Sequence, residues 1–502
     1  MRDREWAISL LIIALAGPAH AQAGHSEQLG TVSFPTSCSA AVQPEFTRAV
    51  ALLHHMTYPE ARKAFAQVAA ADSRCAMAHW GIAMTLFQPL WPTRPSPAAL
   101  QLGWDEVRKA RELPLSEREK LFVTAAEAFF LEPASPDYWL RIRRWQQAAE
   151  AAHTALPGDP EAAVFSALAH LATTPQTRVD RSHADRAAAI LQRVYRQNPD
   201  HPGAMHYLIH ANDVPGREGE LLDITRKYDR AAPHNPHALH MPTHIYVRLG
   251  DWNGVVRGNA LAAAAAKAQP AGEHGEFVWD EFPHAVEYLV YGYLQQGKND
   301  SAAAALAGLE GTDRLEPSFK TAFHLASTRA RYTLERRAWQ EAAEIRPREP
   351  AGLAWDRFPW AEAVSRFARG LGLVHLKRVE EAGREATRLA ELEDRTRNAG
   401  EELFARNIRV LRLELDGWLA QRRGQSDSAR ALLEEAVTIE ASTPKHAVTP
   451  GPTLPALELL GDLYLEQRRP ADALRAYEQS LAGYPGRRLS LQGGAQARKL
   501  LP

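Results

Sequence analysis

The stretch "LPALELLGDLYLEQRRPADALRAYEQSLAGYP" at residues 454–485 decides the fold class of this chain. Its apolar residues recur three and four positions apart on both sides of a short polar break, which predicts two amphipathic helices joined by a tight turn. Gly461 and Ala473 are small enough to let the two helices approach closely, and Tyr464 and Tyr477 fill the space between them. The stretch therefore reads as a helix–turn–helix unit.

The same pattern recurs along the chain, so the fold is repetitive. Further helices of this kind are "YPEARKAFAQVAAADSRCAMAHWGIAM" (58–84), "GDWNGVVRGNALAAAAA", "GKNDSAAAALAGL", "RAWQEAAEI" and "GQSDSARALLEEAVTIE" (424–440). These segments resemble the tetratricopeptide repeat (TPR), and the resemblance covers most of residues 44–486, with irregular insertions. It implies an all-α solenoid, a right-handed superhelix of helix–turn–helix repeats in which each first helix lines a concave groove.

The N-terminus has the pattern of a secretory signal peptide over residues 1–21. Arg2 and Arg4 give a charged start, the apolar stretch 7–16 is too short to span a bilayer, and an A-x-A cleavage site ends at Ala21. An uncleaved anchor is the alternative. We expect a periplasmic or secreted protein without a membrane span in the mature chain. The net charge of −1 and the lack of a long basic run speak against a nucleic-acid partner.

The remaining chain divides by composition and pattern. Cys38 and Cys75 are the only cysteines, and in an oxidising compartment we expect them to form a disulfide, with two buried thiols as the alternative. The expected parts are the N-terminal segment 22–43, the solenoid 44–441 with a His-rich groove, the Pro-rich loop 442–455 ("STPKHAVTPGPTLP") lying over that groove or its rim, and the C-terminal repeat and tail 456–502.

Histidines concentrate in two stretches, "HPGAMHYLIH" (201–210) and "NPHALHMPTH" (235–244). An offset of 34 residues, the length of one TPR, places His206 on His240 and His210 on His244. The residue pattern of the two stretches also resembles that of a group of exported bacterial TPR proteins, which carry HPGxxHYLIH and HALHMPTHIYVRLG. That resemblance implies fold and groove geometry only.

Carried forward, this register gives each first helix a stripe at i, i+3 and i+7, which is one helix face. The twelve positions are Gly203/His206/His210, His237/His240/His244, His284/Glu287/Tyr291 and His324/Ser327/Arg331. Seven of the twelve are histidine, whereas the overall share of 20 in 502 residues predicts about half of one. The stripe therefore predicts a wall of imidazoles in the groove.

Imidazole nitrogens are ligands for Zn, Cu and Fe, so the stripe predicts a transition-metal site. We expect the pairs His206/His210 and His240/His244 to converge on one ion, with His284 and Glu287 completing it or holding a second ion. The predicted ligands are His206, His210, His240, His244, His237, His284 and Glu287, the last three with a supporting role as the alternative. Glu287 is also the candidate general base of a metal-dependent oxidoreductase or hydrolase, and a metal carrier or store is a further form of the idea.

Other residues near the stripe have predicted supporting roles. Substrate binding or ligand orientation is predicted for Tyr207, Asp213, Tyr291, His324 and Arg331, with ordinary packing or a helix-end role as the alternative. His446, on the Pro-rich loop, is a candidate for closing over the site. His79 and His170 fall off the stripe and are expected to be structural. Tyr207 occupies the position where the HExxH motif of zinc proteases requires Glu.

A second reading belongs to another functional class. TPR grooves commonly hold a peptide or a partner protein, which makes an exported adaptor the alternative function. Such a groove is expected to present Lys, Arg, Asn and hydrophobic pockets. Imidazole nitrogens that converge on a common point favour a metal site, and imidazoles spread along the groove favour the adaptor.

Overall fold

The computed structural model describes residues 28–501 except 92–93, 175–177 and 273. The predicted signal peptide lies outside the described residues. Within them the chain is built from α-helices, two short 3-10 helices and one two-stranded sheet.

The helices follow one another along the whole described chain. The first third contains α1 Gln43–His54, α2 Tyr58–Ala71, α3 Ala76–Met84, α4 Pro97–Glu112, α5 Glu117–Phe130, α6 Tyr138–Ala155, α7 Pro160–Ala172 and α8 Ser182–Gln197. The middle contains α9 Pro202–Asn212, η1 Glu218–Leu221, α10 Leu222–Ala231, α11 Pro236–His240, α12 Pro242–Leu249, α13 Trp252–Ala268, α14 Glu281–Gln295, α15 Asn299–Glu310 and α16 Phe319–Leu334.

The last third contains α17 Trp339–Ala343, η2 Trp355–Arg357, α18 Pro359–His375, α19 Val379–Asn398, α20 Glu402–Arg422, α21 Ser426–Ser442, α22 Ala456–Glu466, α23 Pro470–Gly483 and α24 Arg488–Lys499. The strands β1 Pro270–Ala271 and β2 Phe277–Val278 pair antiparallel between α13 and α14.

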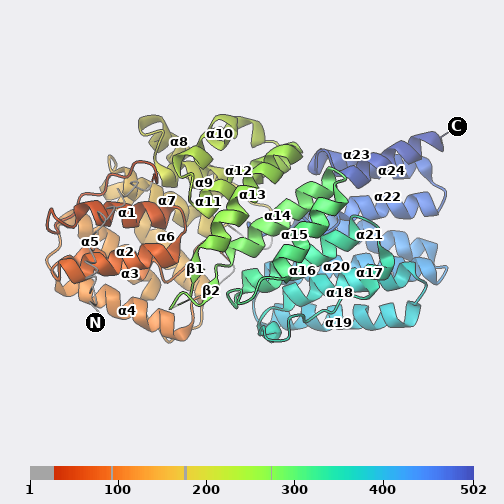
Figure 1. Ribbon diagram of the computed structural model, residues 1–502, viewed down its shortest axis with the longest axis horizontal. Helices are drawn as coiled ribbons and strands as arrows, with labels where there is room; N and C mark the ends of the chain where they lie inside the picture. The colour runs from red at the N-terminus through yellow and green to blue at the C-terminus, as the bar shows by residue number, and fades with distance from the viewer. Residues whose placement is uncertain (1–27, 92–93, 175–177, 273, 502) are drawn as a thin grey trace, which may run out of the picture.

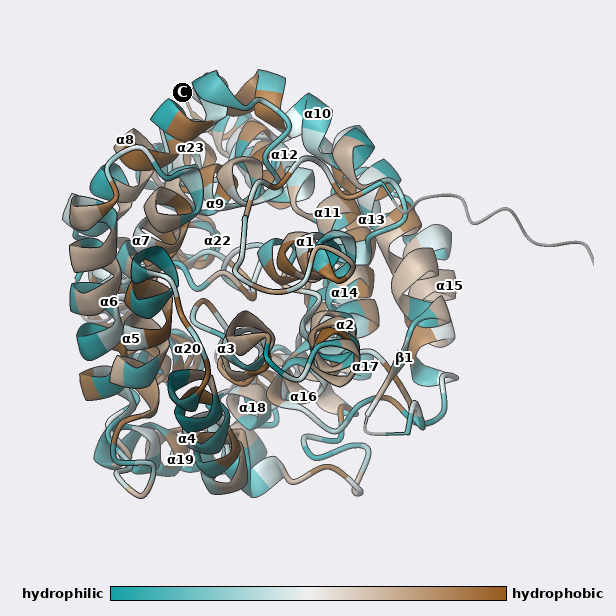
Figure 2. Ribbon diagram, turned by 90° about the vertical axis from the view of Figure 1, so that its left-hand side faces the viewer, coloured by the Kyte–Doolittle hydropathy of each residue, from teal (hydrophilic) through white to brown (hydrophobic). Residues whose placement is uncertain are grey.

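Most helices pack against their neighbours in the sequence, as expected of a solenoid. Figure 1 shows the chain progressing from α1 at one end to α24 at the other, and Figure 2 shows the helices arranged around the long axis. The prediction of an all-α, TPR-like solenoid is confirmed. No helix in the described ranges is long and apolar enough to cross a membrane.

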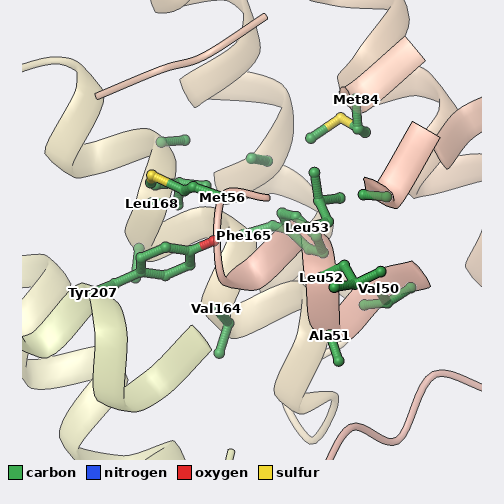
Figure 3. Close-up of a cluster of buried hydrophobic side chains, with 14 of the residues drawn as sticks. Val50, Ala51, Leu52, Leu53, Met56, Met84, Val164, Phe165, Leu168 and Tyr207 are labelled. Atoms are coloured by element: carbon green, nitrogen blue, oxygen red, sulfur yellow. The ribbon is translucent and has the colours of Figure 1, made fainter. Parts of the chain in front are cut away.

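The end of α1 is buried in the N-terminal core, where it reaches α9. Figure 3 shows its apolar residues close to Phe165 of α7 and Tyr207 of α9. Gly203 permits this approach, because a Cβ at that position would lie 2.6 Å from Nδ1 of His54. The close contact places the backbone carbonyl of His54 against the histidines of α9.

A disulfide joins Cys38 to Cys75, with an S–S distance of 2.02 Å. The expected pairing is therefore present, and it ties the N-terminal segment to the start of α3. The amide of Thr31 donates to the carbonyl of Asp200 at 2.8 Å. The N-terminal segment is thus held close to the start of α9.

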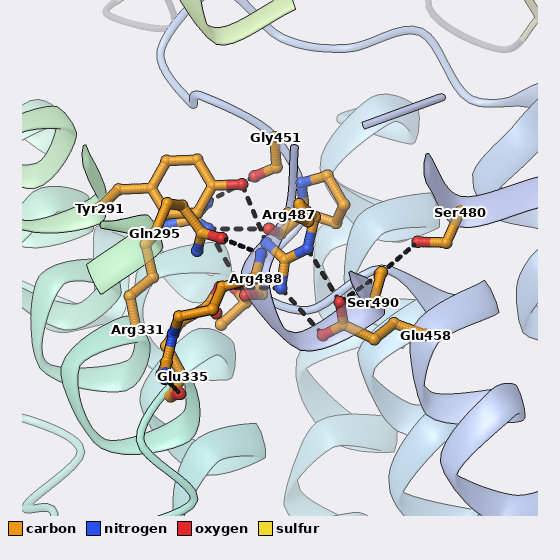
Figure 4. A network of polar contacts seen from close by, with 12 residues as sticks. Tyr291, Gln295, Arg331, Glu335, Gly451, Glu458, Ser480, Arg487, Arg488 and Ser490 are labelled. Atoms are coloured by element: carbon orange, nitrogen blue, oxygen red, sulfur yellow. Dashed lines mark hydrogen bonds and ion pairs between the residues drawn. The ribbon is translucent and has the colours of Figure 1, made fainter. Parts of the chain in front are cut away.

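The C-terminal repeat is anchored to the middle of the molecule by a buried polar network (Figure 4). Arg487 forms ion pairs with Glu458 and Glu335, each at 2.9 Å, and donates to the hydroxyl of Tyr291. Arg331 donates to the carbonyl of Gly451 at 2.6 Å. The irregular segment between α21 and α22, residues 443–455, is thereby fixed against α16.

The stretch that carries His237, His240 and His244 differs from the sequence expectation. We expected one helix, but α11 ends at His240 and α12 begins at Pro242. Proline has no N–H to donate and clashes with the preceding turn, so it interrupts the helix. The two short helices still bring the three imidazoles into one region, as described next.

Candidate metal centre

The structure gathers all seven histidines of the stripe in the middle of the molecule. His206 and His210 lie on α9, His237 and His240 on α11, His244 on α12, His284 on α14 and His324 on α16. Six of these side chains are buried, and His210 is partly exposed. The imidazoles are close neighbours and are not spread along the groove.

Three of them form a first triad, His206, His210 and His237, whose nearest nitrogens all lie within 4.8 Å of one another. Nε2 of His206 is 3.1 Å from Nε2 of His210 and 3.0 Å from Nε2 of His237. The first two residues are four positions apart on α9, and the third comes from α11.

A second triad consists of His240, His244 and His284, again with nitrogens within 4.8 Å of one another. Nε2 of His240 is 3.0 Å from Nε2 of His244, and the His284 ring centre is 4.2 Å from that of His240. The triads adjoin, with the His210 and His244 ring centres 5.9 Å apart. The two pairs were predicted to converge together on one ion; instead each pair is joined by one histidine from a later helix, His237 of α11 or His284 of α14, which gives two groups of three.

The hydrogen bonds of the first triad fix which nitrogen carries the proton. Nδ1 of His206 donates to the carbonyl of His54 at 2.6 Å, and Nδ1 of His237 donates to Oε1 of Glu281 at 2.8 Å. Both partners are acceptors only, so Nδ1 must hold the hydrogen in each ring. In the neutral rings, the Nε2 atoms of His206 and His237 then face each other as lone pairs.

The second triad has the same arrangement. Nδ1 of His240 donates to Oδ1 of Asn259 at 2.7 Å, and the amide of that asparagine in turn donates to a backbone carbonyl. Nδ1 of His244 donates to Oδ2 of Asp213 at 2.8 Å. The Nε2 atoms of His240 and His244 are thus also unprotonated and 3.0 Å apart.

His284 is oriented through a second imidazole. His324 donates from Nδ1 to Glu287 at 2.5 Å, which leaves its Nε2 free to accept from Nδ1 of His284 at 2.9 Å. Nε2 of His284 is buried and has no hydrogen-bond partner among the described residues. It is therefore a third lone pair of the second triad.

Facing lone pairs at 3.0 Å repel each other unless a cation lies between them. Burial and neighbouring imidazoles hold the pKa of His206 and of His240 well below the ordinary value, which disfavours a proton in that place. Two nitrogens bound to one metal ion at about 2.0–2.1 Å lie about 3.0 Å apart at a right angle and about 3.4 Å apart at the tetrahedral angle. The observed separations match a shared metal ion.

Three buried carboxylates support the triads from outside, and each also contacts a cationic side chain. Asp213 contacts His244, Arg248 and Lys445; Glu281 contacts His237 and Lys320; Glu287 contacts His324 and Arg331. Burial opposes ionisation of Glu281, but Lys320 and His237 hold its pKa well below the usual range. The carboxylates thus orient the imidazoles while their charge is balanced by Lys and Arg.

A third histidine group shows what a purely structural cluster looks like here. His54 and His201 both donate from Nε2 to Glu161, at 2.8 and 3.2 Å. Nδ1 of His201 accepts from the amide of Ala204, and Nδ1 of His54 lies 3.3 Å from the hydroxyl of Tyr207. Every polar atom of the two rings has a complementary partner, so this cluster needs no ion.

The histidines off the stripe are placed as expected for structural residues. His79 contacts Glu106 at 2.7 Å, and His170 lies 3.0 Å from His183. His446 lines the cavity next to the first triad, and its ring is tilted against that of Phe404 with centres 5.7 Å apart.

Several predicted site residues lie beside the triads and not in them. The carboxylate of Glu287 accepts from His324, Ser327 and Arg331, so it is behind His284 and not among the converging nitrogens. Arg331 connects Glu287 to the segment 443–455, and Tyr291 belongs to the network of Figure 4. Tyr207 contacts His54. Of the predicted supporting residues, Asp213 and His324 touch a triad histidine directly.

A cavity of about 580 Å³ adjoins the first triad. His210, Trp91 and Asp213 form part of its wall. Trp91 lies edge-on to the rings of His237 and His284, with centres 5.3 and 6.0 Å apart. A molecule in this cavity can therefore approach the triads at His210.

Sequence reasoning missed several residues that complete the centre. They are Glu281, Asn259, Lys320, Lys445, Trp91 and the carbonyl of His54. Glu281 carried a weak signal, because it lies one turn before His284 on the same helix. Lys320 likewise lies one turn before His324 on α16, whereas Asn259, Lys445, Trp91 and the carbonyl of His54 come from segments outside the stripe helices.

Comparisons with known proteins return structural matches only. No protein-family model matches the sequence, and no curated protein matches it. Among solved structures, the chain is similar to that of the APC/C hetero-tetramer Cut9–Hcn1 (TM-score 0.40, 13% identity, 93% of this chain and 78% of that chain). It is also similar to yeast Tom70 (0.34, 12%, 92% and 95%) and to the human IFIT1 dimer with m7Gppp-AAAA (0.37, 14%, 81% and 89%).

Proposed function

We propose that the two triads hold a pair of transition-metal ions, one on each set of three imidazoles. The observation that carries the proposal is the pair of Nε2–Nε2 contacts at 3.0 Å, His206 with His237 and His240 with His244, in rings whose Nδ1 atoms all face acceptors. The hydrogen bonds at Nδ1 keep the proton on that nitrogen and leave Nε2 available as a metal ligand. We further propose that the protein is exported, which the predicted signal peptide and the disulfide between Cys38 and Cys75 support.

The ligand chemistry favours copper. Each triad offers three imidazoles and no carboxylate, whereas carboxylate-rich sets are typical of di-iron centres built between helices. Copper(II) has the highest affinity of the divalent first-row ions for a nitrogen site, and imidazole suits it well. Zinc also accepts three imidazoles, and zinc is therefore the competitor that metal analysis must distinguish.

A pair of copper ions supports an oxidoreductase. The two triads would hold the copper pair, which would supply two one-electron acceptors for an organic substrate that loses two electrons and two protons. Dioxygen would be the oxidant, and it would take up the two electrons and two protons as hydrogen peroxide. In this proposal Glu287 is a positioning residue for His324 and His284, in place of the general base first assigned to it.

The test is metal analysis of untagged protein purified without chelators. We expect two copper ions per chain, and none in the double variant His206→Ala/His240→Ala, which removes a central ligand from each triad. His234→Ala is the matched control, because His234 lies in the same sequence region but is exposed. Full copper content in the double variant, with circular dichroism showing an intact helical fold, would rule out this site.

A further inference from the structure

The cavity beside the first triad has the walls of an organic ligand site. Its volume of about 580 Å³ is far larger than a metal ion or dioxygen needs, and it falls in the range of small-molecule sites. Trp91 lines it at the triad end, and Trp139, Phe404 and Tyr484 line it elsewhere, together with several aliphatic side chains. A ring-bearing, largely apolar molecule fits such walls.

Most of the charges on this wall are already paired. Arg94 forms an ion pair with Glu401 at 3.1 Å, and both Arg248 and Lys445 contact Asp213. These pairs neutralise three of the four Arg and Lys side chains on the wall; the fourth, Arg181, lies 3.6 Å from Asp185.

Two carboxyl groups lack such partners. Glu440 lines this cavity; its carboxyl oxygens face the amide of Ala456 at 3.3 and 3.4 Å and the side chain of Tyr484, with no ion pair within 4 Å among the described residues. Glu414 lines a second cavity of about 90 Å³, which Glu440 also lines, and both of its carboxyl oxygens are buried without a hydrogen-bond partner in the described part of the chain. Buried polar groups without partners are rare in native proteins and call for a ligand or a proton.

Burial raises the pKa of Glu440 to about 7 and that of Glu414 well above its ordinary value. A cationic group between them would supply the missing donors and stabilise both charges. His210 and Glu440 both lie on the wall of the larger cavity.

We infer that this cavity binds an aromatic amine, with its ring beside Trp91 and His210 and its ammonium group at Glu440 and Glu414. The inference rests on the proposed function, because it makes the amine the organic substrate of the metal centre.

The test compares three probes of similar shape on the full-length, copper-loaded protein by isothermal titration calorimetry. The probes are 2-phenylethylamine, 3-phenylpropionate and 2-phenylethanol. We expect 2-phenylethylamine to bind about ten- to a hundredfold more tightly than the other two, because only it can form charge-assisted hydrogen bonds with a carboxylate. Equal or tighter binding of the carboxylate or the alcohol overturns the inference.

Variants assign the recognition to its residues. Glu440→Gln and Glu414→Gln should each weaken binding of the amine about tenfold or more, while Glu435→Gln, an exposed change on the same helix, should leave it unchanged. Amine binding that is unaffected by both cavity variants overturns the assignment. Copper content is measured on every sample to separate the two proposals. A protein that binds the amine but no copper contradicts the metal centre alone. A protein that binds copper but not the amine contradicts the amine site alone.

Discussion

At the residue scale, the centre is defined by which ring nitrogen carries each proton. The stripe pattern placed the seven histidines on one face of their helices, and the structure brings them together. The stripe pattern did not reveal which groups accept the Nδ1 protons. The carbonyl of His54 lies 152 residues from its partner His206, and Oδ1 of Asn259 lies 19 residues from His240. The stripe pattern also assigned Glu287 to the centre itself, whereas the carboxylate lies behind His324.

The relay from Glu287 through His324 to His284 gives a prediction for the second triad. Glu287→Gln removes the carboxylate that holds the proton on Nδ1 of His324, so the tautomer of His284 is no longer fixed. Loss of such an outer hydrogen bond lowers metal affinity by about 10–100-fold. We expect this drop for one of two copper ions in a competition titration with a chromophoric chelator.

The matched control is Glu310→Gln. Glu310 lies at the end of α15 and forms an ion pair with Arg329 of α16, far less buried than Glu287, so its loss should not change the affinity for either copper ion. A Glu287→Gln protein that binds both copper ions as tightly as the wild type contradicts the relay.

At the element scale, the sequence predicted most of the paired helices but only some of the places where the helices are interrupted. The Gly461 and Ala473 pattern correctly indicated paired helices, now seen as α22 and α23. The break at Pro242 was missed because the stripe of histidines continues across it. The contacts of segment 443–455 were also beyond sequence reasoning, since Lys445 reaches an aspartate 232 residues earlier in the chain.

One packing contact between helices makes a prediction about pH. His375, at the end of α18, stacks on Trp339 of α17 with ring centres 3.9 Å apart, and burial together with Arg422 lowers its pKa to about 3. The unfolded chain takes up a proton at this residue below pH 6.5, whereas the folded protein does not until pH 3 is approached. Folding is therefore penalised as pH falls, by about 2 kcal/mol at pH 5.

His375→Phe keeps an aromatic ring on Trp339 and removes the titrating group. We expect the free energy of unfolding, measured with urea, to fall between pH 7.5 and pH 5.0 in both proteins. The fall should be about 2 kcal/mol smaller in the variant than in the wild type. An identical pH dependence in the two proteins shows that His375 does not stay neutral in the folded state.

At the scale of the whole molecule, the solenoid places parts of different repeats around one centre. The end of α1 approaches α9, and segment 443–455 contacts both α16 and Asp213. The repeat pattern predicted the solenoid but not these long-range contacts, because a repeat specifies how it stacks on its neighbours and not which distant segment returns to it. The triads lie where the repeats and these returning segments meet.

The central claim, two metal ions on two histidine triads, is tested most directly by anomalous diffraction from copper-loaded crystals, with data collected on both sides of the copper absorption edge. We expect two anomalous peaks, each about 2.0–2.1 Å from three Nε2 atoms, one at His206, His210 and His237 and the other at His240, His244 and His284. A single peak, or peaks only outside the triads, would contradict the account.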